Sequence, residues 1–163
     1  MNRGLKIRSY DYVNHPYEQV RAALAAEPLA VFQAATKTAT SRANSLASEL
    51  HIDLGGLKLS ADIAILVKNI AHTEASGVSG PSTVIHLEWG AAQHPHLFPF
   101  MKAELALYPL TGRETQLDFS GEYEAPLGLL GSAMNAVAGH RIAESCVHRF
   151  VSDVAEHLRT ALI

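Results

Sequence analysis

Hydrophobic and polar residues alternate along the first part of the chain with the period of a β-strand. Within residues 5–13, one face carries Leu5, Ile7, Ser9, Asp11 and Val13, and the other carries Lys6, Arg8, Tyr10 and Tyr12. The pattern does not decide which face is inside.

Pro16 and Glu18 then favour a helix start, because proline suits a first helical turn and an acidic residue favours the positive end of the helix dipole. From Pro28, apolar residues at spacings of three and four predict a second helix.

The period returns to two at Glu49, which predicts a run of antiparallel strands. The first is residues 49–54, and Gly55-Gly56 permits a tight hairpin into a return strand over residues 57–67. Another strand is expected around residues 85–89, and a last hairpin closes near residues 111–113.

The register of that last hairpin follows from its pattern, because one alignment pairs apolar residues on one face and opposite charges on the other. The pairs are Leu105 with Phe119, Leu107 with Leu117, Met101 with Tyr123, and Lys102 with Glu122.

The C-terminal part predicts one helix of about thirty residues after Gly128, longer than the usual mean of about twelve. Apolar and small residues draw a continuous stripe along it. The stripe comprises Leu129, Ala133, Ala136, His140, Ala143, Val147, Phe150, Val154, Leu158 and Ala161. Only the apolar face of the sheet is large enough to cover this stripe. We therefore expect a single α+β domain over residues 1–163.

This order of elements leads through Thr115 to Gly128 (TQLDFSGEYEAPLG) into a helix containing GHRIAE at residues 139–144. It resembles the SRPBCC or START-like helix-grip superfamily, and in particular its polyketide-cyclase-like branch. The resemblance covers essentially the whole chain and rests on element order and on the passage from Tyr123 to Gly128. It implies a curved antiparallel sheet of about six or seven strands around a long C-terminal helix, with two short helices after the first strand.

The resemblance also implies a deep apolar pocket between the sheet and the long helix. Across the superfamily this pocket takes lipids, hormones, polyketides and aromatic compounds. Some members are cyclases, dehydratases or hydroxylase subunits, and others bind, carry or sense. No residue set defines activity across these members, so no catalytic residue is transferred to this chain.

Charge and cysteine content narrow the function classes. The net charge is -3 and the thirteen Lys and Arg are scattered, which argues against nucleic acid as a partner. Lys6 and Arg8 interrupt any apolar secretion signal, and no stretch reaches the roughly 18 apolar residues of a membrane span, so we expect a soluble cytoplasmic protein. Cys146 is the only cysteine, which excludes an internal disulfide, and we expect it to be a small buried hydrophobe.

Three residues are candidates for acid or base chemistry or for anchoring a ligand. His140 interrupts the inward stripe among small neighbours, and a histidine there could bind a ligand or act as acid or base near neutral pH; the alternative is that it pairs with a backbone carbonyl or reaches solvent. Asp11 would have a raised pKa in an apolar pocket, or it caps a turn or lies on a solvated face. Tyr123 offers a hydroxyl near the pocket mouth, or it is plain packing.

We expect no metal and no cofactor. His140, Glu144 and His148 are spaced by four, but the outer pair is about 12 Å apart along a helix axis, too far to share one ion. His94 and His96 flank a proline without a third ligand nearby. The chain also lacks a nucleophile elbow and a phosphate-binding fingerprint.

The first functional hypothesis is binding of a small hydrophobic or aromatic molecule in an apolar cavity. The residues expected to line it are Ile63, Ile65, Val67, Ile85, Leu87, Trp89, Leu105, Leu107, Leu117, Phe119, Tyr123, Ala136 and His140. One alternative is a cyclase or dehydratase that uses His140, Asp11 or Tyr123. Another is a structural or interaction protein with a filled core. A second apolar side of the long helix could serve a homodimer; it carries Leu130, Met134, Val137 and Ala138.

Overall fold

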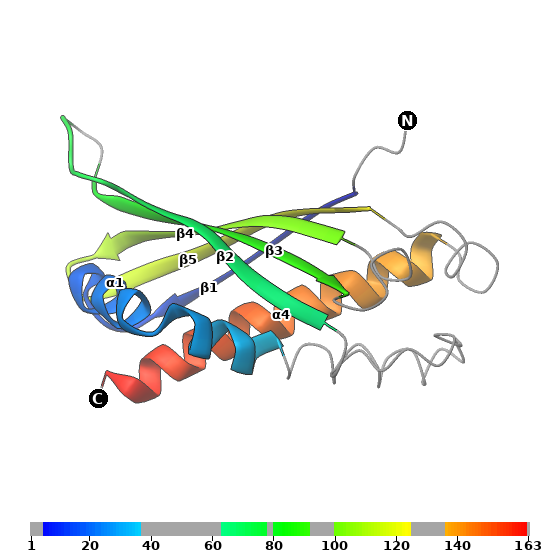
Figure 1. Ribbon diagram of the computed structural model, residues 1–163. Coiled ribbons are helices and arrows are strands. Elements are labelled where there is room, and N and C mark those ends of the chain that lie inside the picture. Colours follow the sequence, from blue (N-terminus) through cyan, green and yellow to red (C-terminus); the bar gives the residue numbers. More distant parts are fainter. Residues whose placement is uncertain (1–4, 37–62, 78–79, 92–99, 125–135, 163) are drawn as a thin grey trace.

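The computed structural model describes residues 5–36, 63–77, 80–91, 100–124 and 136–162 (Figure 1). The described strands are β1 (Leu5–Val13), β2 (Ile63–Thr73), β3 (Ser82–Ala91), β4 (Phe100–Thr111) and β5 (Glu114–Glu124). The described helices are α1 (Tyr17–Ala26), a segment over residues 28–36, and α4 (Ala136–Ala161).

The strands form one twisted antiparallel sheet in the order β1-β5-β4-β3-β2. Helix α4 runs diagonally across one face of the sheet, and α1 lies at one end of that same face (Figure 1). The face toward the helices is called the inner face below. The expected α+β architecture, with a curved antiparallel sheet and a long C-terminal helix, is confirmed.

The predicted register of the last hairpin is confirmed at all four pairs, from Met101 opposite Tyr123 to Leu107 opposite Leu117. The register is well specified because a slip by one residue would turn every apolar side chain to solvent. An irregularity between Pro109 and Thr111 ends the regular ladder just before the turn.

Strand β2 contains a β-bulge at Lys68, where the register against β3 shifts. Before the bulge Val67 lies opposite Leu87, and after it Ile70 lies opposite Ile85, so apolar side chains stay on the inner face. Five of the six or seven expected strands are thus described. The predicted strand at residues 49–54, the Gly55-Gly56 hairpin and the start of the return strand lie outside the described residues.

The structure decides the question that the sequence left open for β1. Ile7, Ser9 and Val13 are buried on the inner face, whereas Tyr10 and Tyr12 are exposed on the outer face. This set of side chains faces the helices because it lies on the same side of the sheet as the apolar residues of β5. Ser9, for example, is opposite Phe119.

The helices follow the predicted pattern where they are described. Helix α1 begins after Pro16 and buries Tyr17, Val20 and Leu24. None of the described helices is long and apolar enough to cross a membrane.

The stripe on α4 is confirmed at four positions and wrong at one. The buried members are Val147, Phe150, Val154 and Leu158. Ala161, at the C-terminal end of α4, is exposed. Several expectations lie outside the described side chains: the start of the stripe, the proposed dimer face at Leu130, Met134, Val137 and Ala138, and the loop histidines His94 and His96.

The core is organised around Phe150 of α4. Its ring centroid lies 4.8 Å from that of Trp89 in an edge-to-face arrangement, and 6.0 Å from those of Phe119 and Phe32. These four rings are called the aromatic cluster below. Because Trp89 and Phe119 come from the sheet and Phe32 from the segment 28–36, one side chain joins three parts of the fold.

We expect Phe150→Ala to lower the free energy of unfolding by about 3–5 kcal/mol, because it removes ring contacts and leaves a cavity. Denaturant unfolding followed by circular dichroism measures this change. Leu66→Ala, on a side chain that is 55% exposed, is the matched control and should change stability by no more than about 0.5 kcal/mol. Equal effects of the two substitutions would show that the aromatic cluster does not hold the core.

Candidate functional site

The inner face of the sheet is the candidate site, and most of the predicted lining residues gather there. Buried side chains among them are Ile65, Ile85, Leu87, Trp89, Leu105, Leu107, Leu117 and Phe119, and Val67 is half-buried. The side chains of Ile63, Tyr123, Ala136 and His140 lie outside the described part of the structure.

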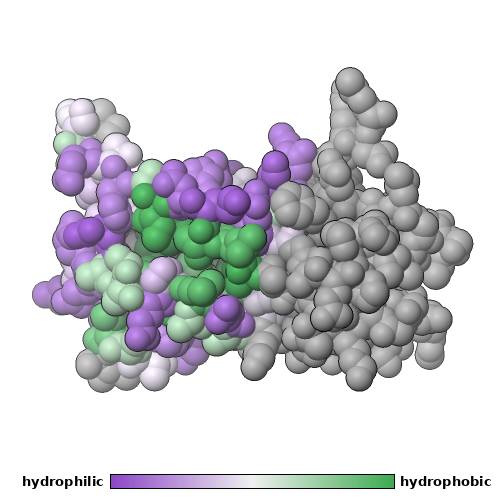
Figure 2. Space-filling model, in the orientation of Figure 1, coloured by the Kyte–Doolittle hydropathy of each residue, from purple (hydrophilic) through white to green (hydrophobic). Residues whose placement is uncertain are grey.

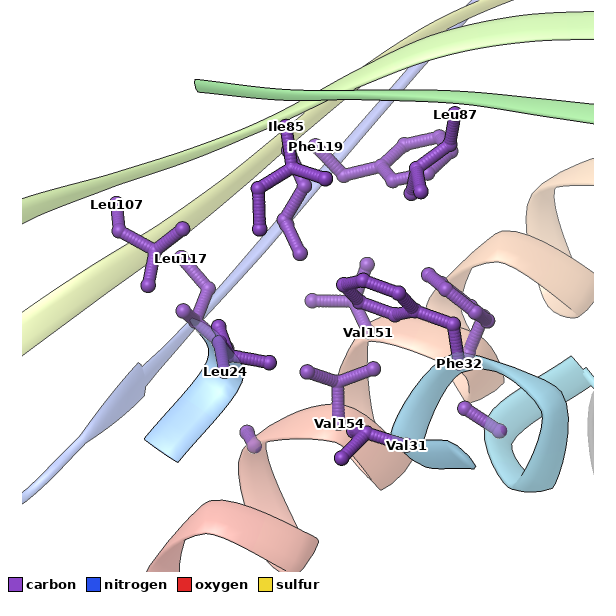
Figure 3. Packing of buried hydrophobic residues seen from close by; sticks show 14 of the residues in the cluster. Leu24, Val31, Phe32, Ile85, Leu87, Leu107, Leu117, Phe119, Val151 and Val154 are labelled. Carbon is purple, nitrogen blue, oxygen red and sulfur yellow. The ribbon is translucent and has the colours of Figure 1, made fainter. Parts of the chain in front are cut away.

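The end of the inner face next to α1 is closed. Leu107 and Leu117 point toward Leu24 of α1, and all three are almost completely buried (Figure 3). Hydrogen bonding adds to the closure, since the Tyr17 and Thr83 hydroxyls lie 2.6 Å apart. The residues at this end therefore pack against one another.

The other end of the inner face, at Trp89, is buried but slightly more exposed than the closed end. Along β3 the exposed fraction rises from 1% at Ile85 to 8% at Trp89. Along β4 it rises from 0% at Leu105 to a half-buried Met101. Trp89 lies opposite both Ile65 and Met101 in the two neighbouring strands, so these three side chains form one row across the sheet. This row is called the Trp89 row below.

The Trp89 ring is held in a defined orientation. Its Nε1–H donates a 3.1 Å hydrogen bond to Thr36 Oγ1, and the Thr36 hydroxyl donates in turn to the Phe32 carbonyl at 2.7 Å. A buried indole N–H without a partner would cost about 1–3 kcal/mol, so Thr36 contributes directly to the position of Trp89. The sequence did not single out Thr36, because it is one of several threonines in a predicted helix.

A small-residue row next to the Trp89 row makes room for an aromatic ring. Ala103 pairs with Gly121 on the inner face. A Cβ atom at Gly121 would lie only 2.9 Å from the Phe119 ring and 3.2 Å from Met101 Sδ. The missing side chain of Gly121 therefore leaves the space that the Phe119 ring and the Met101 sulfur occupy.

The candidate acid Asp11 is engaged in a clamp at the edge of the sheet. Its Oδ1 accepts hydrogen bonds from Arg159 Nη2 at 2.8 Å and from the Tyr12 backbone N–H at 2.7 Å. Arg159 Nη2 also donates to the Tyr12 carbonyl at 2.6 Å, and the guanidinium lies 5.5 Å from the Tyr12 ring centroid. These contacts satisfy the open edge of β1 and tie it to the end of α4.

His148 has a partner that the sequence did not reveal. Its Nδ1 lies 3.1 Å from the hydroxyl of buried Ser9, which joins α4 to the inner face of β1. On the sequence His148 stood out only as a poorly spaced metal ligand. Among the described residues, no three His, Cys, Asp or Glu side chains are grouped closely enough to hold a metal ion.

The Cys146 thiol is unsuited to nucleophilic chemistry. Burial raises its pKa from 9.0 to about 12, so the thiol stays protonated at neutral pH.

Comparison with known proteins identifies the fold. The sequence matches no protein-family model and no curated protein sequence. The aromatase/cyclase Zhui from Streptomyces sp. R1128 is similar in structure, with a TM-score of 0.52 and 13% identity over 98% of this chain and 96% of that chain. A conserved protein from Geobacillus kaustophilus gives a TM-score of 0.50 at 13% identity over 96% of this chain and 97% of that chain. The chain has the helix-grip fold, and at these identities the likeness extends to the fold alone.

We expect the Asp11 clamp to be worth more than an ordinary surface ion pair. Asp11→Asn and Arg159→Met should each lower the free energy of unfolding by about 1–2 kcal/mol, because each leaves half-buried polar groups unpaired. A double-mutant cycle should give a coupling energy of at least about 0.5 kcal/mol.

The matched control for the clamp is the pair Glu18 and Arg21 on α1, which lie 2.7 Å apart; the Glu18 side chain is 70% exposed and the Arg21 side chain is 34% exposed. A cycle with Glu18→Gln and Arg21→Met should give a coupling energy below about 0.5 kcal/mol. A coupling of Asp11 with Arg159 that is no larger than this one would mean that the clamp does not stabilise the edge of β1.

Iodoacetamide should alkylate Cys146 at pH 8 at least about a hundredfold more slowly in the folded protein than in guanidinium, because the raised pKa lowers the thiolate fraction. The folded state favours the thiol, so the corresponding stability is present below pH 9 and is lost as the pH rises from about 9 toward 12. Mass spectrometry of the single cysteine measures the rate. Equal alkylation rates in both states would contradict a buried thiol.

Proposed function

We propose that the protein binds a small hydrophobic or aromatic molecule between the sheet and α4, at the Trp89 row. The observation that carries this proposal is the small rise in exposure along the inner face toward Trp89, which is 8% exposed, and toward half-buried Met101. Apolar surface that the fold itself leaves incompletely covered gains free energy when a ligand covers it, by about 25 cal/mol per Å².

The chemistry of this end favours an apolar ligand with a flat ring. Ile65, Leu87, Trp89 and Met101 provide an aliphatic and aromatic surface, and the described inner face carries no charged side chain beside them. An indole ring offers a stacking partner, and the unbranched methionine adapts to ligands of different shape.

Access is expected from the side of β2. Val67 and Ile70 belong to the inner face of this strand, yet they are only partly buried against the core. Hydrophobic residues gather at the surface between β2 and the helices, bordered by hydrophilic ones (Figure 2). An apolar molecule could reach the Trp89 row here without crossing a charged barrier.

The proposal narrows the set of ligand contacts expected from the sequence. Leu105, Leu107 and Leu117 belong to the closed end. We expect them to pack behind the residues that contact the ligand and not to contact it themselves. Tyr123 and His140 remain predicted polar anchors for a ligand. Asp11 is not proposed as the acid or base of a cyclase or dehydratase, because its carboxylate already binds Arg159 and the Tyr12 amide.

Fluorescence of Trp89, the only tryptophan of the chain, tests the proposal directly. Titration with 2-naphthol and with decanoic acid should shift or quench its emission in a saturable way. Met101→Phe places a larger side chain beside Trp89 and should weaken binding of either probe at least about tenfold, a loss of about 1.4 kcal/mol.

Leu110→Phe is the matched control, since it enlarges a side chain that is 48% exposed and distant from the Trp89 row. It should leave the probe affinity unchanged. Saturable binding that is the same in both variants would place the ligand elsewhere, and emission unaffected by either probe would end the proposal.

A further inference from the structure

The outer face of the sheet carries a second candidate site, on the side away from α4. It is a hollow of about 320 Å³ lined by Arg8, Tyr10, Tyr108, Gln116 and Asp118. The strand registers bring these residues together, because Tyr10 lies opposite Asp118 and Tyr108 lies opposite Gln116. Three neighbouring strands, β1, β5 and β4, thus build the hollow without any contribution from the helices.

The hollow has aromatic walls on a floor of small and polar side chains. Tyr10 and Tyr108 stand on β1 and β4, on either side of β5, and Ala106 next to Asp118 is too small to fill the space between them. Tyr10 is 70% exposed, the highest value among the large hydrophobic residues that the structure describes. Tyr108 is half-buried, so the Tyr10 ring is the more accessible of the two for stacking from the solvent side.

Several hydrogen-bonding groups in the hollow are free. In the described part of the chain, the side chains of Tyr10, Tyr108 and Gln116 have no hydrogen-bond partner. Together they offer hydroxyl and amide groups that can both donate and accept. Arg8 uses Nε and Nη2 toward Asp118, which leaves Nη1 free to donate.

The charges in the hollow cancel. Arg8 and Asp118 form a bidentate pair, with Nε to Oδ1 at 3.2 Å and Nη2 to Oδ2 at 2.8 Å. An anionic ligand would meet the Asp118 carboxylate and a cationic ligand would meet the Arg8 guanidinium. A neutral ligand that both donates and accepts hydrogen bonds avoids both penalties.

We propose that this hollow binds a neutral saccharide through one pyranose ring. A pyranose presents a flat face of C–H groups, whose slight positive charge suits the negative face of a tyrosine ring. Its rim carries hydroxyl groups that match the planar guanidinium, carboxylate and amide groups of Arg8, Asp118 and Gln116. Because the hollow is open and shallow, the affinity for a single sugar ring is weak, in the millimolar range.

Amide chemical shifts in a ¹⁵N-labelled sample test the proposal, with methyl glycosides of glucose, galactose and mannose as the probes. At least one glycoside should shift the amides of residues 8, 10, 108, 116 and 118 in a saturable way. Tyr10→Ala should weaken that binding at least about tenfold, because it removes one stacking wall, whereas Tyr10→Phe should keep most of it.

Two controls separate this site from unspecific sugar effects. Leu66→Ala removes an exposed apolar side chain of β2, outside the hollow, and should leave the affinity unchanged. Sorbitol has the hydroxyl groups but no ring face and should cause no saturable shift. Absence of saturable shifts at these amides for all three glycosides, or equal shifts in wild type and Tyr10→Ala, would overturn the proposal.

Discussion

The packing of Phe150 against the sheet is the interaction on which the rest of the structure depends. Its ring meets Trp89 and Phe119 from the sheet and Phe32 from the segment 28–36. Because large rings rather than small side chains mediate this contact, they set the distance between α4 and the inner face. Near α1, buried leucines and valines fill the space between the helices and the sheet. Near Trp89, the exposure of the inner residues rises slightly.

Helix α4 is fastened asymmetrically. It packs chiefly against β1, where Ser9 meets His148 and Asp11 meets Arg159. At the opposite edge of the described sheet, the inner residues Val67 and Ile70 are only partly buried. The polar contacts thus hold the β1 side of the helix, and the ligand route proposed above lies at the opposite edge of the described sheet, near β2. The two faces of the sheet can serve separate purposes, since the outer hollow shares no residue with the Trp89 row.

Much of the described fold was predictable because its signals are local. The register of β4 and β5 follows from alternation and one charge pair, and the α4 stripe follows from spacings of three and four. The inner side of β1 was not predictable, because both faces mix polar and apolar residues and the choice depends on long-range contacts with β5 and α4. Asp11 shows the same limit, since its partner Arg159 lies 148 residues away along the chain.

The sequence predicted which residues of the candidate site face inward. It did not predict which of them are closed off by α1. Leu107 and Trp89 look equivalent in an alternating pattern, yet one packs against α1 and the other lies where burial declines. Thr36 carried no signal, because its role depends on the orientation of a single indole ring. The outer hollow also gave no signal, since it arises from the juxtaposition of three strands whose tyrosines are far apart in sequence.

The central claim is that the Trp89 row is completed by an apolar small molecule. Native mass spectrometry of the protein purified from its own host tests this claim most directly. We predict a species heavier than the polypeptide by the mass of one noncovalently bound organic molecule, which dissociates under denaturing conditions and is depleted in Met101→Phe. A wild-type protein that carries only its own mass, and takes up neither 2-naphthol nor decanoic acid when these are added, would contradict the account.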